Sequence, residues 1–282
     1  MHDSPIKIRD LILAFLFSLI IIICLFFGSY FNRTTKIVFC DVGQGDAAYI
    51  RIKNKIDVLI DAGPDKKILN CLGRHMPFWD RKIELVILSH PNKDHYAGFS
   101  YIIERYKLDM FITVNPVITS KSYKKLVSKI IDKKIRFQYE SAGDKIKIDQ
   151  TLFDFYWPPG DFKSYQDNDY SLVFLFEEND FRLLFTGDAS PKVLNSLYSL
   201  CVGNKNFCSL PVNILKIPHH GSRTGLTKKF LELADPMIAV ISVGKNNSYG
   251  HPSKEVLDML KAQNVKIKRT DVDGDIVFNL KE

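Results

Sequence analysis

The sequence has few cysteines, no internal repeat and no low-complexity segment. Its five cysteines are too few for a disulfide-rich scaffold, and no two of them have the C-x-x-C spacing that is typical of a structural zinc site. Charged residues make up 25% and hydrophobic residues 46% of the 282 residues, which excludes a disordered or collagen-like protein. The net charge of +7 is compatible with phosphates or an anionic membrane as a partner and is weak evidence for either.

Charge is missing altogether from one stretch near the N-terminus. Residues 11–32 carry no charged side chain, and residues 11–28 are almost wholly aliphatic or aromatic. Eighteen helical residues span about 27 Å, roughly the thickness of one hydrocarbon core, and no polar stripe interrupts them. We predict a transmembrane helix over about 11–28, within an N-terminal membrane anchor of residues 1–33. A cleaved signal peptide is the alternative, but the stretch is long for one and lacks an A-x-A-like cleavage site.

The side of the membrane on which the domain lies is left open by the flanking charges. Two basic residues precede the apolar stretch and two follow it, so the positive-inside rule does not decide its orientation. Cys201 and Cys208 bracket a short loop and could form a disulfide outside the cytoplasm, or remain two ordinary thiols. Cys40 lies in a strand-like run and is expected in the core, while Cys71 has no assigned role.

From about Thr35 onward, apolar strand-like runs alternate with helical periodicity. The expected strands are 36–40, 47–52, 56–60, 84–89, 109–114, 151–156, 170–176, 181–187, 213–217, 237–243, 265–269 and 276–280, with a hairpin turn at 177–180. The expected helices are 95–106, 120–134, 190–199, 224–233 and 253–263. This order predicts two sheets packed face to face with helices outside, in one domain of residues 34–282.

The expected helix over 120–134 is unusually basic. One face is apolar, and lysines crowd the remainder of its surface. Such a face could attract a polyanion, although a solvated helix face is the commoner explanation and the one we favour from the sequence.

Five of the seven histidines gather in three short segments, each directly after an apolar strand or in the loop that follows one. They are His90, His95, His219, His220 and His251. Strand ends are where a sheet fixes the backbone while a loop frees the side chain for chemistry.

Carboxylates accompany these histidines. In residues 89–98, Asp94 stands beside His95, and imidazole with carboxylate suits Zn²⁺, Mn²⁺ or Fe²⁺, although Asp94 could also cap a helix. Asp188 ends an apolar strand, where it could bridge two cations or cap the next helix. In residues 214–222, two adjacent histidines lie in a Pro/Gly turn and need polar partners. Together with a fourth segment at 246–253, this pattern favours a metal site.

These segments resemble the metallo-β-lactamase superfamily and, more closely, the metallo-β-lactamase-type domain of ComEC-type DNA-internalisation (competence) proteins. The matching strings run in order from about Lys36 to the C-terminus: FCDVGQGDAAYI, VLIDAG, LSHPNKDHYAG, NDYSLVF, LLFTGDA, LKIPHHGS, ISVGKNNSYGHP and RTDVDGDIVF. The resemblance implies an α+β fold, an αββα four-layer sandwich with a metal site at one edge.

The resemblance also implies a ligand set. The superfamily's H-x-H-x-D-H motif, its bridging aspartate and its last histidine fall in turn on His90, Asn92, Asp94, His95, Asp188 and His220, with His219 as the fallback for the last. Asn92 thus stands where the motif has a histidine.

A second departure is that no histidine occurs between His95 and His219, so Asn168 or Asp169 would stand in for the family's middle histidine. The cofactor is expected to be one or two divalent ions. An oxygen-rich ligand set shifts the expected metal somewhat from Zn²⁺ towards Mn²⁺.

The resemblance implies a membrane-anchored metal-dependent hydrolase, a phosphodiesterase or nuclease in which metal-activated water attacks phosphorus in DNA. Asp94 would bind metal and orient the nucleophile. His251 would act as general acid or hold a phosphate oxygen, unless it only begins a helix. Asp46 would orient a ligand, whereas Asp61 is expected to support loops. The candidate substrate contacts are Gln44, Asp46, Ser222, Asn247 and Tyr249, of which Ser222, Asn247 and Tyr249 each have a plain turn-residue alternative.

Two alternatives from other classes stay open. The same fold could hydrolyse a small phosphodiester, thioester or lactam. It could also be a degenerate, non-catalytic component of a membrane DNA-uptake complex, which Asn92 and the missing histidine favour. The single apolar stretch predicts a single-pass protein of the cell membrane, whereas full competence proteins carry a channel of several helices. The resemblance implies an extracytoplasmic domain and DNA-uptake machinery as a partner.

Overall fold

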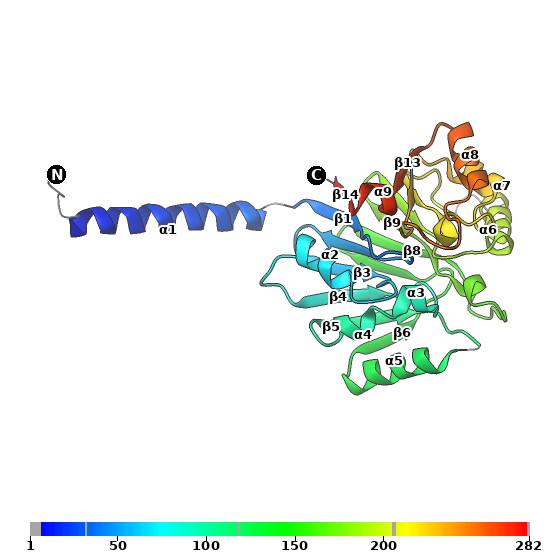
Figure 1. Ribbon diagram of the computed structural model, residues 1–282, viewed down its shortest axis with the longest axis horizontal. Helices are drawn as coiled ribbons and strands as arrows, with labels where there is room; N and C mark the ends of the chain where they lie inside the picture. Colours follow the sequence, from blue (N-terminus) through cyan, green and yellow to red (C-terminus); the bar gives the residue numbers. More distant parts are fainter. Residues whose placement is uncertain (1–6, 32, 118, 205–206, 281–282) are drawn as a thin grey trace.

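The computed structural model describes residues 7–31, 33–117, 119–204 and 207–280, with the side chains of 25–27 and 29–31 left out. Helix α1 (Ile8–Phe31) projects away from the rest of the chain (Figure 1). Its described apolar side chains are exposed, as for Phe15 at 67%. The predicted span over 11–28 includes residues 25–27, which lie outside the described side chains. Within the part that is described, no helix combines the length and the apolar character needed to cross a membrane.

The rest of the described chain forms two seven-stranded sheets. The first contains, in spatial order, β14 (Ile276–Leu280), β1 (Thr35–Phe39), β2 (Ala48–Ile52), β3 (Ile56–Ile60), β4 (Lys82–Ile87), β5 (Lys107–Thr113) and β6 (Arg136–Tyr139). The second contains β13 (Lys266–Arg269), β12 (Ile238–Ile241), β11 (Ile214–Lys216), β10 (Phe181–Phe185), β9 (Val173–Glu178), β8 (Thr151–Trp157) and β7 (Lys145–Ile148). In both sheets the strands pair parallel on one side and antiparallel on the other.

Helices cover the outer faces of both sheets. The first sheet carries α2 (Ile68–His75), α3 (Lys93–Tyr96), α4 (Phe99–Ile102) and α5 (Lys121–Asp132). The second carries α6 (Pro191–Gly203), α7 (Lys228–Ala234) and α8 (Lys254–Ala262), and α9 (Thr270–Asp273) follows β13. Two 3-10 turns, η1 (Asp167–Tyr170) and η2 (Pro218–Gly221), complete the described elements.

Three separate clusters of buried side chains hold these four layers together. Alternate residues of each strand point to opposite faces, so β1 sends Ile37 and Phe39 to the core between the sheets and Val38 to the core beneath the helices. The prediction of two face-to-face sheets with helices outside is confirmed. Each expected strand is present to within a few residues, and the hairpin at 177–180 joins β9 to β10.

The expected helix over 95–106 is wrong, because the chain there forms two short helices. The carbonyl of Asp94 accepts from the N–H of Asp46, and the N–H of Gly98 donates to the carbonyl of Gly63. These backbone groups therefore bond to neighbouring loops instead of continuing one helix. The sequence also did not reveal β6 and β7, which are four-residue strands at the sheet edges with partly exposed side chains.

Two disulfides link four of the five cysteines, and Cys24 of α1 is free. Cys40 at the end of β1 is bonded to Cys71 of α2, and Cys201 is bonded to Cys208. The expectation that Cys40 lies in the core is confirmed, because its side chain is fully buried. Cys71, for which the sequence indicated no role, is its disulfide partner, since α2 packs over the first sheet. For Cys201 and Cys208 the structure has the disulfide and not two free thiols.

We expect the two disulfides to stabilise the domain unequally. Replacing both Cys40 and Cys71 with alanine opens a crosslink between residues 31 apart, which should lower the free energy of unfolding by about 3–4 kcal/mol. The matched double variant at Cys201 and Cys208, which are 7 residues apart, should lose about 2 kcal/mol. Urea unfolding of the oxidised chain measures both values. Equal losses would contradict the difference in loop length as the cause.

Candidate metal centre

Four side chains from three distant segments meet at the edge of the two sheets. Asp94, His95, Asp188 and His220 each offer one ligand atom, and these atoms all lie within 4.8 Å of one another. Nε2 of His95 is 3.3 Å from Oδ1 of Asp188, and Nε2 of His220 is 3.2 Å from Oδ2 of Asp94. Ligands at 2.0–2.1 Å around a tetrahedral ion are separated by about 3.3 Å. The two closest pairs therefore have the spacing of one coordination sphere, and other pairs are wider, as for Nε2 of His95 and Oδ2 of Asp94 at 4.0 Å.

The sheets place each of these residues at a strand end. Asp94 and His95 lie on α3 after β4, Asp188 follows β10, and His220 lies in η2 after β11. His95, Asp188 and His220 are at most 2% exposed, whereas 36% of the Asp94 side chain is exposed. Solvent and a ligand can therefore approach the cluster on the side of Asp94.

The backbone is strained around the cluster. His219, His220 and Asp61 have φ values of 52°, 54° and 55°, in the left-handed region that non-glycine residues rarely adopt. Such conformations cost about 1–3 kcal/mol each and persist where the surrounding structure enforces them, often at functional sites. In η2, the left-handed turn brings the ring of His220 to the cluster.

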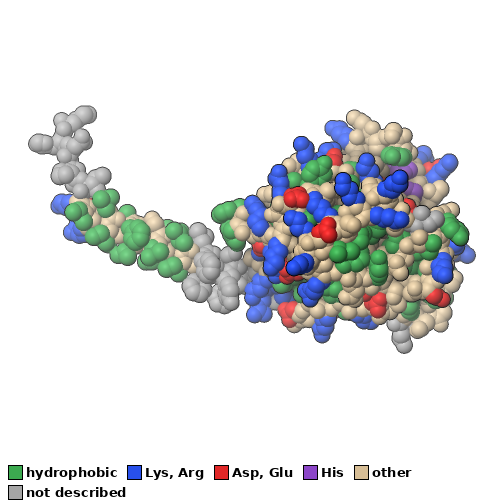
Figure 2. Space-filling model, turned by 90° about the horizontal axis from the view of Figure 1, so that it is seen from below, with side chains coloured by type: hydrophobic (Ala, Val, Ile, Leu, Met, Phe, Trp, Pro, Cys, Tyr) green, Lys and Arg blue, Asp and Glu red, His purple; other side chains and the backbone are tan. Residues whose placement is uncertain are grey.

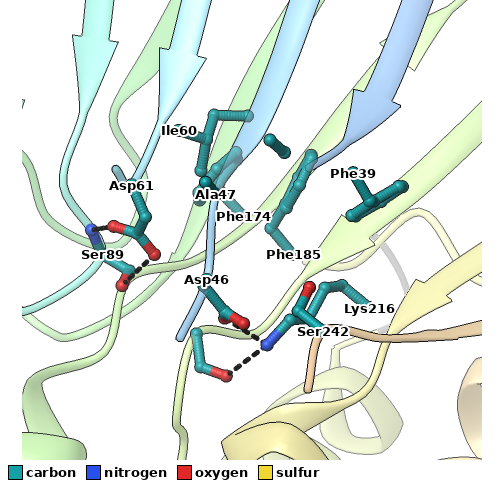
Figure 3. A pocket seen from close by; sticks show the side chains of 12 residues that line it. Phe39, Asp46, Ala47, Ile60, Asp61, Ser89, Phe174, Phe185, Lys216 and Ser242 are labelled. Atoms are coloured by element: carbon teal, nitrogen blue, oxygen red, sulfur yellow. Dashed lines mark hydrogen bonds and ion pairs between the residues drawn. The ribbon is translucent and has the colours of Figure 1, made fainter. Parts of the chain in front are cut away.

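Both histidine rings are oriented by hydrogen bonds at their other nitrogen. Oδ2 of Asp61 is 2.8 Å from Nδ1 of His95, and Asp61 also accepts from the hydroxyl of Ser89 (Figure 3). Nδ1 of His220 is 3.0 Å from the carbonyl of Ser242. Nε2 of each ring is thereby left to face the cluster, as in metal-binding histidines. Asp61, which was expected to support loops only, also fixes the ring of His95.

A buried ion pair lies beneath the cluster. Figure 3 shows Asp46 and Lys216 pointing toward one another, and their side chains form an ion pair that is shielded from solvent. Oδ1 of Asp46 also lies 3.2 Å from Nδ1 of His220. Burial raises the pKa of Asp46, but Lys216 and His220 outweigh it and lower the pKa overall. Asp46 is therefore a charged group that supports a ligand.

Sequence reasoning missed Lys216. Its only signal was a charged residue inside the otherwise apolar strand β11. The space beside it, under Phe39, Phe174 and Phe185, has a volume of about 10 Å³ and holds one water molecule at most. A substrate therefore cannot reach the cluster from between the sheets.

Several buried polar atoms at the cluster have no hydrogen-bond partner among the described residues. They are Nε2 of His90, and also Nε2 of His95 and Oδ1 of Asp188, which lie 3.3 Å apart but without the geometry of a hydrogen bond. Buried polar atoms are rarely left unpaired, so these atoms fit a bound cation. The His90 ring lies 4.2 Å from that of His95, and burial together with His95 lowers the pKa of His90 to about 3. His90 is thus a neutral imidazole, the form that binds metals.

The charges of the cluster also favour a bound cation. Burial lowers the pKa of both rings, but neighbouring carboxylates outweigh it. Asp188 and Asp61 hold the pKa of His95 well above its ordinary value. Asp188 and Asp46 raise the pKa of His220 to about 10. Against the effect of burial, His220 and His95 hold the pKa of Asp188 well below its ordinary value. Without a cation the carboxylates therefore keep protons on both rings. A divalent cation can replace these protons, because metal ligands bind in their deprotonated form.

Other predicted ligands lie outside the group of four. Nδ2 of Asn92 donates to Oδ1 of Asn168 at 2.7 Å, so these two side chains face each other. The carboxylate of Asp169 accepts from the hydroxyls of Ser164 and Ser190, the second of which caps α6. Both oxygens of Asp169 are therefore engaged away from the cluster.

Two histidines lie at the rim. Nε2 of His219 is 4.0 Å from Oδ2 of Asp188, and the ring of His251 lies 5.9 Å from that of His219. Burial lowers the pKa of both rings. Tyr249 is 68% exposed and stacks on His251, which places its ring at the entrance.

The remaining substrate candidates mainly join loops. Oε1 of Gln44 accepts from the N–H of Gly244, and Asn247 donates to the carbonyls of Gly244 and His251. The hydroxyl of Ser222 lies 3.0 Å from that of Thr224. These contacts hold the loops around the cluster in place.

Comparison with curated proteins finds three competence-type relatives among its matches. The chain is 25% identical over 258 residues to ComE operon protein 3 of Bacillus subtilis, covering 86% of this chain and 32% of that protein. It is 26% identical to Recombination protein 2 of Haemophilus influenzae, covering 92% and 31%, and 28% identical to Competence protein ComA of Neisseria gonorrhoeae, covering 85% and 31%. The chain thus spans about a third of each relative's length. The resemblance to competence proteins that the motifs indicated is confirmed. No model of a known protein family matches the chain.

Solved structures identify the fold. The metallo-β-lactamase fold protein YhfI of Bacillus subtilis superposes with a TM-score of 0.60 at 10% identity, covering 87% of this chain and all of that one. Zn²⁺-bound PqqB of Methylobacterium extorquens superposes with a TM-score of 0.54 at 12% identity, covering 84% and 88%. The chain therefore has the metallo-β-lactamase fold, as the motifs predicted.

The contact between Asp61 and His95 can be tested by metal titration. Asp61→Ala removes the acceptor that orients the ring, which should weaken binding of Zn²⁺ or Mn²⁺ by about 10- to 100-fold. Isothermal titration calorimetry of the purified chain measures the affinity, and circular dichroism checks that the variant is folded. Asp258→Ala, on the exposed surface of α8, is the control and should bind metal like the wild type. Unchanged affinity in folded Asp61→Ala would reject this role for Asp61.

Proposed function

We propose that the protein is a metal-dependent phosphodiesterase that cleaves DNA, with Zn²⁺ or Mn²⁺ as cofactor. The observation that carries this proposal is the convergence of two imidazoles and two carboxylates whose ligand atoms all lie within 4.8 Å of one another. The competence-type relatives support DNA as the substrate, and the metallo-β-lactamase fold supports a hydrolase.

Each residue of the centre has a part in this proposal. Asp94, His95, Asp188 and His220 would hold one ion, and the neutral His90 would help to hold a second. When bound, the cation supplies Lewis acidity and makes water nucleophilic near neutral pH. Asp94 is the most exposed of the ligands, so its carboxylate would also orient the attacking water on the open side of the cluster.

The rim would bind the substrate. Burial, with His219 and His220, lowers the pKa of His251, so its ring is neutral near pH 7. A neutral ring donates one N–H to a phosphate oxygen more readily than it delivers a proton to a leaving group. We therefore place His251 as a phosphate contact, with Tyr249 beside it as a surface on which a base can stack.

We also propose that the protein is attached to the cell membrane through α1, with its domain on the extracytoplasmic side. The exposed apolar side chains of α1 support the attachment. The two disulfides support the extracytoplasmic location, because disulfides persist in oxidising compartments. DNA-uptake machinery is the partner that the competence-type relatives suggest.

Metal content and DNA cleavage by the purified full-length chain test the proposal together. We expect one to two ions per chain and cleavage of single-stranded DNA with Mn²⁺ or Zn²⁺. Asp188→Ala and His95→Ala should lose the metal and reduce cleavage by at least about 100-fold, because each removes a ligand of the ion.

Two outcomes would reject the proposed nuclease activity. A wild-type chain that binds no metal would favour the non-catalytic component of a DNA-uptake complex. A metal-loaded chain that leaves DNA intact but hydrolyses a small phosphodiester, thioester or lactam would favour the small-molecule hydrolase. Asp258→Ala controls for effects of substitution alone.

A further inference from the structure

We propose that the groove between α3 and α5 binds the phosphate backbone of a single nucleic-acid strand and leads it to the metal centre. This inference rests on the proposed function and adds to it the site that holds the substrate. The groove has a volume of about 400 Å³, which lies within the range of ligand pockets. The polar residues that line it are Lys93, Tyr96, Ser100, Ser122, Lys125 and Lys129.

The groove is built as a unit by the contact of the two helices. The hydroxyl of Tyr96 on α3 is 2.7 Å from that of Ser122 on α5, and 3.2 Å from that of Ser120, which caps α5. Ser122, Lys125 and Lys129 are spaced by three and four residues, so they share one face of α5. That face lines the groove, while the buried Tyr123, Leu126 and Ile130 pack α5 against the first sheet.

The groove carries uncompensated positive charge. Among the described residues, no acidic side chain lies within ion-pair distance of Lys93 or Lys125, whereas Lys129 is paired with Glu104. Figure 2 views the molecule from the side on which α5 lies, and it shows many Lys and Arg side chains with few Asp and Glu. Histidine side chains are visible at one edge of the same face.

The groove lies next to the metal centre because α3 contributes residues to both. Lys93 precedes Asp94 directly, so their Cα atoms are about 3.8 Å apart. Asp94 and His95 point to the cluster, and Lys93 and Tyr96 line the groove. A strand lying in the groove is therefore in contact with the helix that carries two of the metal ligands, which places its next phosphates within reach of the cluster in our proposal.

The lining favours phosphate recognition without base recognition. Lysines and hydroxyls bind phosphate oxygens in a sequence-independent way. The aromatic ring in the lining, Tyr96, is only 5% exposed and uses its hydroxyl to join the two helices, so it offers no surface for stacking. A flat anionic membrane is the competing partner, but a bilayer does not enter a concave groove.

Fluorescence anisotropy with a labelled single-stranded oligonucleotide tests the groove independently of cleavage, since binding is measured with EDTA present. We compare Lys125→Gln with Lys124→Gln in the full-length chain in a neutral detergent. The two lysines are adjacent, exposed and on the same helix, but Lys124 does not line the groove. Lys125→Gln should weaken binding several-fold and reduce the slope of log K against log salt by about 0.7, and Lys124→Gln should change neither.

The outcomes separate this inference from the proposed function. Equal affinities of both variants for DNA would overturn the inference that the groove binds DNA, even if the wild type cleaves DNA. Weaker binding by Lys125→Gln alone would support the groove, even if the wild type does not cleave DNA and the nuclease proposal fails. Co-sedimentation with phosphatidylglycerol vesicles tests the competing partner, an anionic membrane. A loss of vesicle binding in Lys125→Gln without a loss of DNA binding would assign the groove to lipid and overturn the inference.

Discussion

The structure depends on a concentration of buried negative charge at one edge of two facing sheets. Asp46, Asp61 and Asp188 are at most 5% exposed, and Asp94 stands beside them. Charges removed from water are costly unless they are paired, and removal of one partner leaves the other uncompensated. Lys216 pairs with Asp46, and the imidazoles of His95 and His220 carry protons that balance the rest. A cation in the cluster is the natural replacement for those protons.

The fold keeps this charge in place through its loops. The same peptide that supplies Asp94 and His95 also accepts backbone hydrogen bonds at both residues, from the N–H groups of Asp46 and Ala62. The strained backbone at Asp61 and His220 is part of the same arrangement, since relaxing either residue would turn its side chain away from its partner. The loop contacts thus hold both the strained backbone and the buried charge in place, and the ion pair of Asp46 with Lys216 also joins the two sheets.

Much of this could be predicted from the sequence, because strand ends are visible as the ends of apolar runs. Asp94, Asp188 and His220 were identified in this way. The contacts of Asp61 and Lys216 were not. Asp61 meets His95 because the neighbouring strands β3 and β4 end side by side in the first sheet, and Lys216 meets Asp46 only when the two sheets face each other. The pairing of Cys40 with Cys71 was also not predicted, because it depends on how α2 packs over the first sheet. Short, polar edge strands such as β6 gave no apolar run to detect.

The short helix α3 explains how binding and chemistry could be coupled in one molecule. Four residues contribute two metal ligands on one side and two lining residues of the basic groove on the other. Because α3 is held by hydrogen bonds to the loops that carry Asp46 and Asp61, it cannot shift without disturbing the partners of both histidine rings. The distance between a phosphate in the groove and the cluster is therefore fixed by the scaffold. A longer, continuous helix over 95–106 would have lost this constraint, since its hydrogen bonds would have stayed within the helix.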